Sequence, residues 1–143
     1  MSLSGTYDDA NIFARILRGE LPCAKVYEDE HVLAFLDLFP QSRGHTLVIP
    51  KHTKARNLLD APADALQTLM VGVQTVAAGL NAALKPDGLV VTQFNGAPAG
   101  QTVFHLHVHI IPRYEGEALR PHGGGMADSA ELAELANAIS AAM

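Results

Sequence analysis

Apolar and polar residues alternate with a period of two in several short stretches, which is typical of strands with one buried face. The clearest case is residues 31–38, where Leu33, Phe35 and Asp37 point to one face and the residues between them to the other. Turn residues and prolines separate these stretches, and Pro50 and Pro112 are each expected to stop a strand. The pattern predicts five strands, at residues 24–28, 31–38, 45–49, 89–94 and 102–111.

Helical spacing of apolar residues appears in three other segments. A short helix is expected at residues 10–18 with Asp9 as its cap, and a long helix begins near Pro62 and continues to Leu84. Asp128 is expected to cap a last helix at residues 129–142.

Strands that are not separated by regular helices indicate an α+β fold with a mostly antiparallel sheet. The length of 143 residues suits a single domain, 1–143, with its core at about 10–113 and a C-terminal loop and helix at 114–143. Residues 1–8 are expected to be a loose terminus.

Charge and cysteine content exclude several classes of function. The single cysteine, Cys23, rules out a disulfide within the chain and a Cys-x-x-Cys metal site, so it is expected to be an ordinary apolar residue. A net charge of −5 disfavours binding to a nucleic-acid backbone. No apolar run is long enough to span a membrane, and a cytoplasmic location is the expectation.

The fifth predicted strand carries three histidines, His105, His107 and His109, which alternation places on one face. Such a row could be an exposed face with incidental histidines, a metal site, or a site of nucleophilic histidine chemistry. Neutral imidazole can attack phosphorus when its other nitrogen holds a proton on a fixed acceptor, and a second histidine can protonate the leaving group. The opposite face is apolar and is expected to pack on the long helix; it comprises Phe104, Leu106, Val108 and Ile110.

The loop before this strand, residues 95–102, favours the nucleophilic reading over the metal site. It contains small residues and no carboxylate, a composition that suits backbone amides approaching an anion closely. The alternative reading is a tight turn between two strands.

Residues 99–113, Ala-Gly-Gln-Thr-Val-Phe-His-Leu-His-Val-His-Ile-Ile-Pro-Arg, resemble the signature of the histidine triad (HIT) family. The resemblance extends to residues 12–16 and 44–50 and covers about residues 10–113. It implies a HIT-like fold and cleavage of nucleoside monophosphate derivatives at the alpha-phosphate through a nucleotidyl-histidine intermediate. It further implies a purine nucleotide or conjugate as partner, a homodimer, and no required cofactor or metal.

The resemblance also assigns roles to positions. His107 matches the nucleophile, His109 the residue at the leaving group, His105 the first triad member, and His45 a histidine that supports the row. Asp37 matches the position that holds the ribose hydroxyls. The expected base pocket comprises Ile12, Phe13, Ile16, Leu21, Phe35 and Leu38, and the expected phosphate or leaving-group contacts are Asn95, Gly100, Gln101 and Thr102.

Two positions depart from the family pattern. Phe94 stands eleven residues before His105, where the family usually has an Asn or Gln that touches the phosphate. Asn11 and Ala14 stand where some relatives have two cysteines of a structural zinc site, so no such zinc is expected.

Four functions therefore remain open. The resemblance favours hydrolysis of a purine nucleoside phosphoramidate, and hydrolysis of a diadenosine polyphosphate is the related alternative. The other two are nucleotide binding without catalysis and metal binding by His105, His107 and His109.

Overall fold

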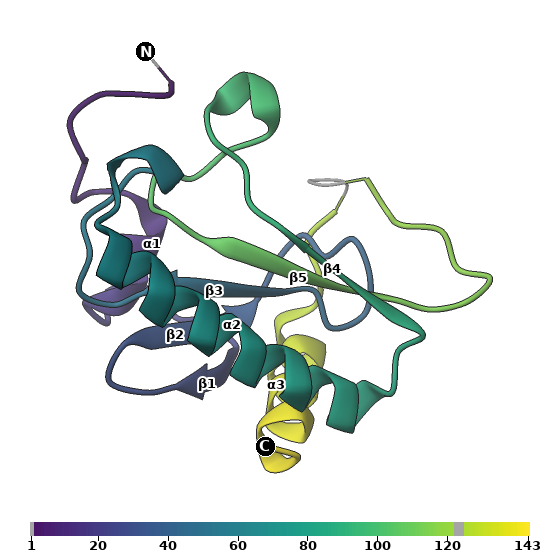
Figure 1. The fold of residues 1–143 in the computed structure, drawn as a ribbon. Helices are drawn as coiled ribbons and strands as arrows, with labels where there is room; N and C mark the ends of the chain where they lie inside the picture. Colours follow the sequence, from purple (N-terminus) through teal and green to yellow (C-terminus); the bar gives the residue numbers. More distant parts are fainter. Residues whose placement is uncertain (1, 122–124) are drawn as a thin grey trace.

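Five strands form one sheet in the computed structural model, which describes residues 2–121 and 125–143 (Figure 1). Every pair of neighbouring strands is antiparallel, and the order across the sheet is β1-β2-β3-β5-β4. The predicted α+β fold is confirmed. The strands are β1 (Lys25–Glu28), β2 (Val32–Leu36), β3 (Thr46–Pro50), β4 (Gly88–Thr92) and β5 (Val108–Arg113).

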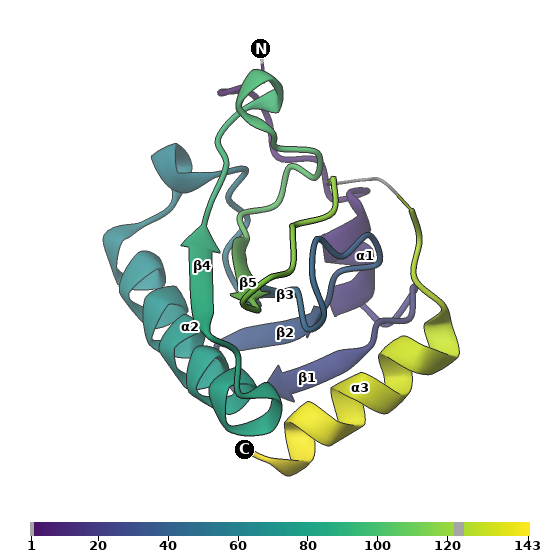
Figure 2. The ribbon, with the colours of Figure 1, turned by 90° about the vertical axis from the view of Figure 1, so that its right-hand side faces the viewer.

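Three helices cover the sheet: α1 (Ile12–Leu17), α2 (Ala63–Leu84) and α3 (Ser129–Ala141). Side chains of α2 and α3 share one apolar core with the sheet, and α1 packs on the opposite face (Figures 1 and 2). Two short 3-10 turns, η1 (Leu58–Asp60) and η2 (Ala97–Ala99), lie in the connections. Within residues 2–121 and 125–143, no helix combines the length and apolar character that crossing a membrane requires.

The alternation of β2 divides its side chains between the two cores as predicted. Val32, Ala34 and Leu36 join the core with α2 and α3, whereas Leu33 and Phe35 join the core with Phe13 of α1. All five side chains of β2 are buried, so both faces of this strand are covered. Because the α1 side is the face toward which Asp37 continues the alternation, the sheet directs polar chemistry to that side.

Pro50 ends its strand as predicted, as the last residue of that strand, whereas the prediction that Pro112 ends a strand was wrong. Pro50 is the last residue of β3 and pairs with Val32, and Pro112 lies inside β5 opposite Leu89. Proline lacks an N–H but keeps its carbonyl, so it can pair where only an acceptor is needed. The predicted fifth strand also began too early. Residues 102–107 lie outside the sheet, where the amide of Leu106 donates to the carbonyl of Ala55 at 2.9 Å instead of to a strand.

The start of the chain also differs from the prediction. Asn11, rather than Asp9, caps α1 by accepting from the amide of Ala14, so the helix is shorter than expected. Residues 2–10 are tied to the rest of the molecule rather than loose, because Arg56 donates to the carbonyl of Ser2 and Asn57 to that of Leu3. Side-chain donors from another loop hold backbone carbonyls here, a contact that local sequence does not reveal.

The C-terminal helix follows the prediction closely. Asp128 caps α3 by accepting from the amide of Glu131, and Leu132 and Ile139 are buried in the core with α2. The helix therefore docks on its own subunit. Part of the expected C-terminal loop, residues 122–124, lies outside the described residues.

Candidate active site

A cavity of about 400 Å³ lies between α1 and the sheet, and two histidines of the row open into it. This volume is within the range for small-molecule sites, which are mostly apolar with a few polar groups. Nine residues of the expected site line it: Ile12, Phe13, Ile16, Phe35, Asp37, Leu38, Thr102, His107 and His109. The remaining lining residues are Pro22, Cys23, Ala24, Leu36, Phe39, Leu47 and Val103.

Other expected site residues do not line this cavity. His105 and His45 are buried behind His107 and His109, where they support the row. Leu21 and Gly100 lie outside the lining as well. The structure therefore separates residues that can touch a ligand from residues that can act only through others.

One end of the histidine row is held by backbone carbonyls. His107 Nδ1 lies 2.6 Å from the carbonyl oxygen of His105, and His105 Nε2 lies 3.2 Å from that of Pro50. A carbonyl only accepts, so in this orientation of the two rings each of these nitrogens carries a proton. In neutral His107 the remaining nitrogen, Nε2, then carries no proton and keeps its lone pair (a bare nitrogen), which is the state a nucleophile needs.

His105 is neutral at ordinary pH because burial lowers the pKa of its imidazole to about 4. With its single proton on Nε2, its Nδ1 must accept, and the hydroxyl of Tyr7 donates to it at 2.6 Å. Both nitrogens of this buried ring thus have partners.

The other end of the row is held by side chains. His45 is itself oriented by the backbone N–H of Gln41, which donates to His45 Nδ1 at 3.0 Å and so places the proton of His45 on Nε2. His45 Nε2 lies 2.9 Å from His109 Nδ1 and 3.4 Å from Asp37 Oδ2, so both acceptors draw on one proton. With Nδ1 accepting, neutral His109 carries its own proton on Nε2.

His107 and His109 therefore hold their protons on opposite ring nitrogens, although both line the same cavity. Their ring centroids are 5.1 Å apart. A bare imidazole nitrogen and an imidazole N–H side by side can attack an electrophilic centre and protonate the group that leaves it.

Two aromatic rings frame this pair. Phe13 of α1 meets His107 edge to face, with centroids 4.9 Å apart. Phe94 lies 5.1 Å from the ring of His109, so it approaches the histidine expected at the leaving group. The neighbours of Phe94 turn elsewhere, since Gln93 donates to the side chain of Asn95, which in turn accepts from the amide of Leu58. Asn95 therefore stabilises the loop, and the cavity lining does not include it.

The loop at residues 95–102 is shaped by its own hydrogen bonds. Gly96 and Gly100 have φ angles of 88° and 110°, a region that favours glycine. Buried Gln101 donates to the carbonyls of Arg56 and Val103 and accepts from the amide of Gly96. The amides of Gly100 and Gln101 donate to carbonyls within the loop, which leaves Thr102 as the member that faces the cavity.

The described residues contain one group of side chains close enough to share a metal ion, namely Asp37, His45 and His109. Its donor atoms lie within 4.8 Å of one another. His105 and His107 do not belong to this group, so the three triad histidines are not arranged around one common point in the described residues. At the N-terminal positions considered for zinc, Asn11 caps a helix and Ala14 offers no ligand atom.

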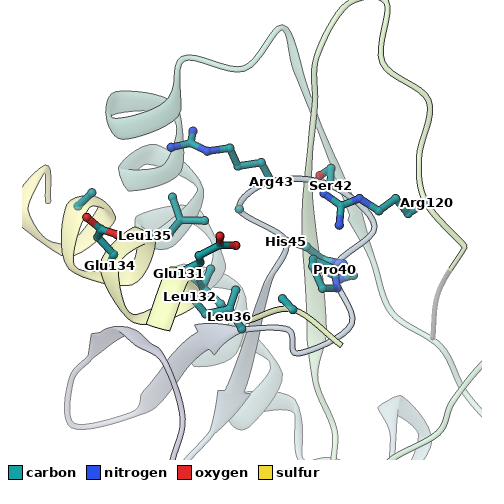
Figure 3. Close-up of a pocket in the computed structure, with 13 residues that line it drawn as sticks. Leu36, Pro40, Ser42, Arg43, His45, Arg120, Glu131, Leu132, Glu134 and Leu135 are labelled. Atoms are coloured by element: carbon teal, nitrogen blue, oxygen red, sulfur yellow. The ribbon is translucent and has the colours of Figure 1, made fainter. Parts of the chain in front are cut away.

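A larger cavity, about 550 Å³, lies on the other side of the loop before β3, between that loop and α3 (Figure 3). Arg43 and Arg120 border it together with Glu131 and Glu134 of α3, and His45 contributes to its wall. These charges are balanced, and His105, His107 and His109 are not among the residues that line this space. The chemistry of the histidine row is therefore directed to the smaller cavity.

Several lining residues were missed in the sequence although a signal was present. Val103 has the same parity as the three histidines, Phe39 continues the alternation of Phe35 and Asp37, and Leu47 faces the α1 side in β3. Cys23 is half-buried in the same wall, and burial raises the pKa of its thiol. No pattern pointed to Tyr7, which lies 98 residues from its partner in sequence.

Fold and site together define an α+β protein whose chemistry centres on a buried histidine row beneath a short helix. The sequence model of the HIT domain matches residues 18–116, and the chain belongs to the HIT family. This confirms the resemblance seen in residues 99–113.

Named relatives agree with this placement. The chain is 48% identical to "Protein hit" of Bacillus subtilis over 103 residues, 72% of this chain and 70% of that protein. It is 39% identical to adenylylsulfatase HINT3 of Arabidopsis thaliana over 116 residues, 81% of this chain and 58% of that protein.

Solved structures extend the agreement to the fold. A Hit-like protein involved in cell-cycle regulation from Bartonella henselae, crystallised with an unknown ligand, has a TM-score of 0.89 and 47% identity, covering 96% of this chain and 100% of that chain. A hypothetical histidine triad nucleotide-binding protein from Sulfolobus tokodaii has a TM-score of 0.82 and 40% identity, covering 91% and 89%.

Proposed function

We propose that this protein is a nucleotide-binding hydrolase that transfers the nucleoside monophosphate part of its substrate to His107 and then to water. The observation that carries this proposal is that His107 Nδ1 faces a backbone carbonyl whereas His109 Nδ1 faces Nε2 of His45, although both rings line one cavity. Similarity to an adenylylsulfatase and to a histidine triad nucleotide-binding protein supports nucleotide chemistry of this kind.

In the first step, His107 Nε2 attacks the alpha-phosphorus and a nitrogen–phosphorus bond forms. The bond from phosphorus to the leaving group breaks, and the leaving atom takes the Nε2 proton of His109. For this step His109 carries a second proton on Nδ1, with Asp37 then accepting from His45 Nε2, so the ring that remains is neutral imidazole. His107 gains positive charge on bonding to phosphorus, which offsets the proton lost by its neighbour. The His105 carbonyl stabilises this charge because it accepts from His107 Nδ1.

In the second step, water attacks phosphorus from the side that the leaving group has vacated. His109 Nε2 takes one proton of that water, the bond to His107 breaks, and a nucleoside monophosphate is released. Both histidines then regain their starting protons, so the cycle needs no metal or redox cofactor.

A purine nucleoside phosphoramidate is the substrate class we propose. The apolar walls contributed by Ile12, Ile16 and Phe35 suit a flat base, and Asp37 at the cavity edge would accept from ribose hydroxyls. A diadenosine polyphosphate has the same reacting part and a much larger leaving group. Comparing kcat/KM for the two substrate types decides between them, and we expect the higher value for the phosphoramidate.

The test of this function is the turnover of an adenosine phosphoramidate by His107→Asn. We expect kcat to fall by at least about 10⁴-fold, since removal of a nucleophile leaves only binding and electrostatic effects. Calorimetric binding of adenosine monophosphate should persist. His52→Asn is the matched control, because His52 is exposed, its ring contacts the carbonyl of Glu30, and it does not line the cavity. Full turnover by His107→Asn would remove the proposed nucleophile.

Phe94 favours one second candidate, nucleotide binding without significant catalysis. Phe94 lies beside His109 and occupies the position at which the family usually has an Asn or Gln that touches the phosphate. This candidate predicts binding of adenosine monophosphate by the wild-type protein but no hydrolysis of either substrate type. The turnover measurement on wild-type protein separates it from the hydrolase.

We propose that the protein forms a homodimer through the β4 edge. β4 lies at one end of the sheet, and Leu89, Val90 and Val91 on it are 36%, 37% and 46% exposed. An exposed apolar edge strand pairs readily with a second copy. Val91→Asp should shift the sedimentation of the protein from dimer to monomer, and a monomeric wild-type protein would contradict this. A cytoplasmic location stays a prediction.

A further inference from the structure

The N-terminal segment, residues 2–10, contacts the histidine row through one side chain, that of Tyr7. Ser2 and Tyr7 are the half-buried residues of this segment, and its other residues are exposed. The Tyr7 hydroxyl lies 2.6 Å from His105 Nδ1, and the two rings meet edge to face at 5.7 Å. Figure 2 shows this segment beside the η2 turn, in the connection between β4 and β5.

Several ties fix the segment on both sides of Tyr7. Asn57, which is buried, donates to the carbonyl of Leu3 at 2.9 Å, and Arg56 donates to that of Ser2 at 3.1 Å. Beyond Tyr7, Lys54 pairs with Asp9 at 3.0 Å. Tyr7 is thus held from outside the site, so its contact with His105 does not depend on the ring that it touches.

We propose that Tyr7 is a positioning residue for catalysis, which fixes the tautomer and orientation of His105 and through it the orientation of His107; this rests on the proposed function. His105 offers one bare nitrogen, and a phenolic hydroxyl is the donor that reaches it. The carbonyl of the same residue accepts from His107 Nδ1 at 2.6 Å. The Tyr7 contact is made by the ring of His105 and the His107 contact by its backbone carbonyl, so we expect Tyr7 to act on His107 through the backbone adjustment that accompanies rotation of the His105 ring.

The chemistry of the alternative tautomer shows why a donor is needed. With its proton on Nδ1, His105 would place a bare Nε2 against the Pro50 carbonyl, two acceptors facing each other at 3.2 Å. The ring could escape that repulsion only by rotating in its buried site. The Tyr7 hydroxyl favours the proton on Nε2 and removes this second arrangement.

The test compares Tyr7→Phe with Tyr27→Phe. The first change keeps the ring against His105 and removes only the hydroxyl. The control loses a phenolic hydrogen bond of similar length, 2.8 Å to Asp29, away from the row. For Tyr7→Phe we expect kcat on an adenosine phosphoramidate to fall by about 10-fold to 100-fold, the effect of a misplaced reacting group, with little change in KM. Tyr27→Phe should keep wild-type kcat and KM.

Two further measurements separate positioning from general destabilisation. In a His105→Asn background, Tyr7→Phe should cause no additional loss of kcat, because its effect passes through His105. Proton–nitrogen correlation spectra of the histidine rings should show a single tautomer of His105, protonated on Nε2, in the wild-type protein and two tautomers in Tyr7→Phe.

The outcomes decide between the two proposals. An unchanged His105 spectrum in Tyr7→Phe, or a changed spectrum with wild-type kcat, overturns the role of Tyr7. If the wild-type protein hydrolyses no nucleotide derivative, the proposed function fails, and the spectra alone then decide whether Tyr7 sets the tautomer.

Discussion

The two ends of the histidine row are held by different kinds of contact. At one end, His105 and His107 donate to backbone carbonyls, which cannot release or take up a proton. At the other, His109 accepts from His45, whose Nε2 also lies 3.4 Å from the carboxylate of Asp37, so side chains rather than carbonyls surround this ring. Adjacent imidazoles in one cavity wall therefore have unlike surroundings.

This difference accounts for the two roles proposed for the pair. A nucleophile needs a fixed lone pair, and a carbonyl on its other nitrogen provides one. A group that gives and then takes a proton benefits from polarisable neighbours that follow the change in charge. Because the residue types are identical, the roles come from second contacts that alternation along a strand does not reveal.

Loss of His109 should have the largest effect that distinguishes the two ends. We expect His109→Asn to lower kcat on an adenosine phosphoramidate by about 10²-fold to 10⁴-fold, the usual contribution of a general acid. With a nitrophenyl ester of adenosine monophosphate, whose leaving group departs without a proton, the loss should be much smaller. His107→Asn serves as the comparison and should be inactive on both substrates. Equal losses of His109→Asn on both substrates would exclude its role as the proton donor.

Protonation of His105 should be the next largest effect, measured on stability. The pKa of its imidazole is lowered by burial from 6.5 to about 4. Between these pH values His105 is protonated in the unfolded chain but not in the folded chain. Its effect on the free energy of unfolding is therefore absent above pH 6.5, and this free energy falls by about 3 kcal/mol as the pH is lowered to 4.

Urea unfolding between pH 7 and pH 4 tests this expectation. The free energy of unfolding should fall more steeply with decreasing pH in the wild-type protein than in His105→Asn. Equal pH slopes for the two proteins would show that His105 does not titrate differently on unfolding.

Asp37 should have the smallest effect of the three and separates two roles for its carboxylate. Asp37→Asn keeps an oxygen for the amide of Phe39 but removes the charge beside His45 Nε2. We expect kcat to fall by about tenfold, the equivalent of about 1.4 kcal/mol. This loss should persist with a substrate that lacks both ribose hydroxyls. If the variant equals wild type on that substrate, Asp37 acts only on the ribose.

Much of this site could be predicted from the sequence because strand alternation is local. The period of two placed Phe35 and Asp37 on one face of β2, and the same parity brought His107 and His109 into one cavity. The same alternation, continued two residues beyond Asp37 and two residues before His105, would also have found Phe39 and Val103.

What could not be predicted depends on contacts between distant segments. The hydrogen bond from Tyr7 to His105 needs residues 2–10 to be tied down by Arg56 and Asn57, and neither shows that role in sequence. The late start of β5, after His107, was missed for a related reason, since the amide of Leu106 pairs with Ala55 outside the sheet. The family resemblance placed Gln101 at a phosphate. Its side chain instead bonds backbone groups of Gly96, Arg56 and Val103, which only folding brings to it.

The most direct test of the account is the position of the covalent intermediate. Wild-type protein mixed with an adenosine phosphoramidate, quenched at alkaline pH during turnover and digested, should yield one peptide heavier by an adenosine monophosphoryl group. Fragmentation should place that group on His107. An adduct on His105 or His109 instead, or turnover with no adduct at any histidine, would contradict it.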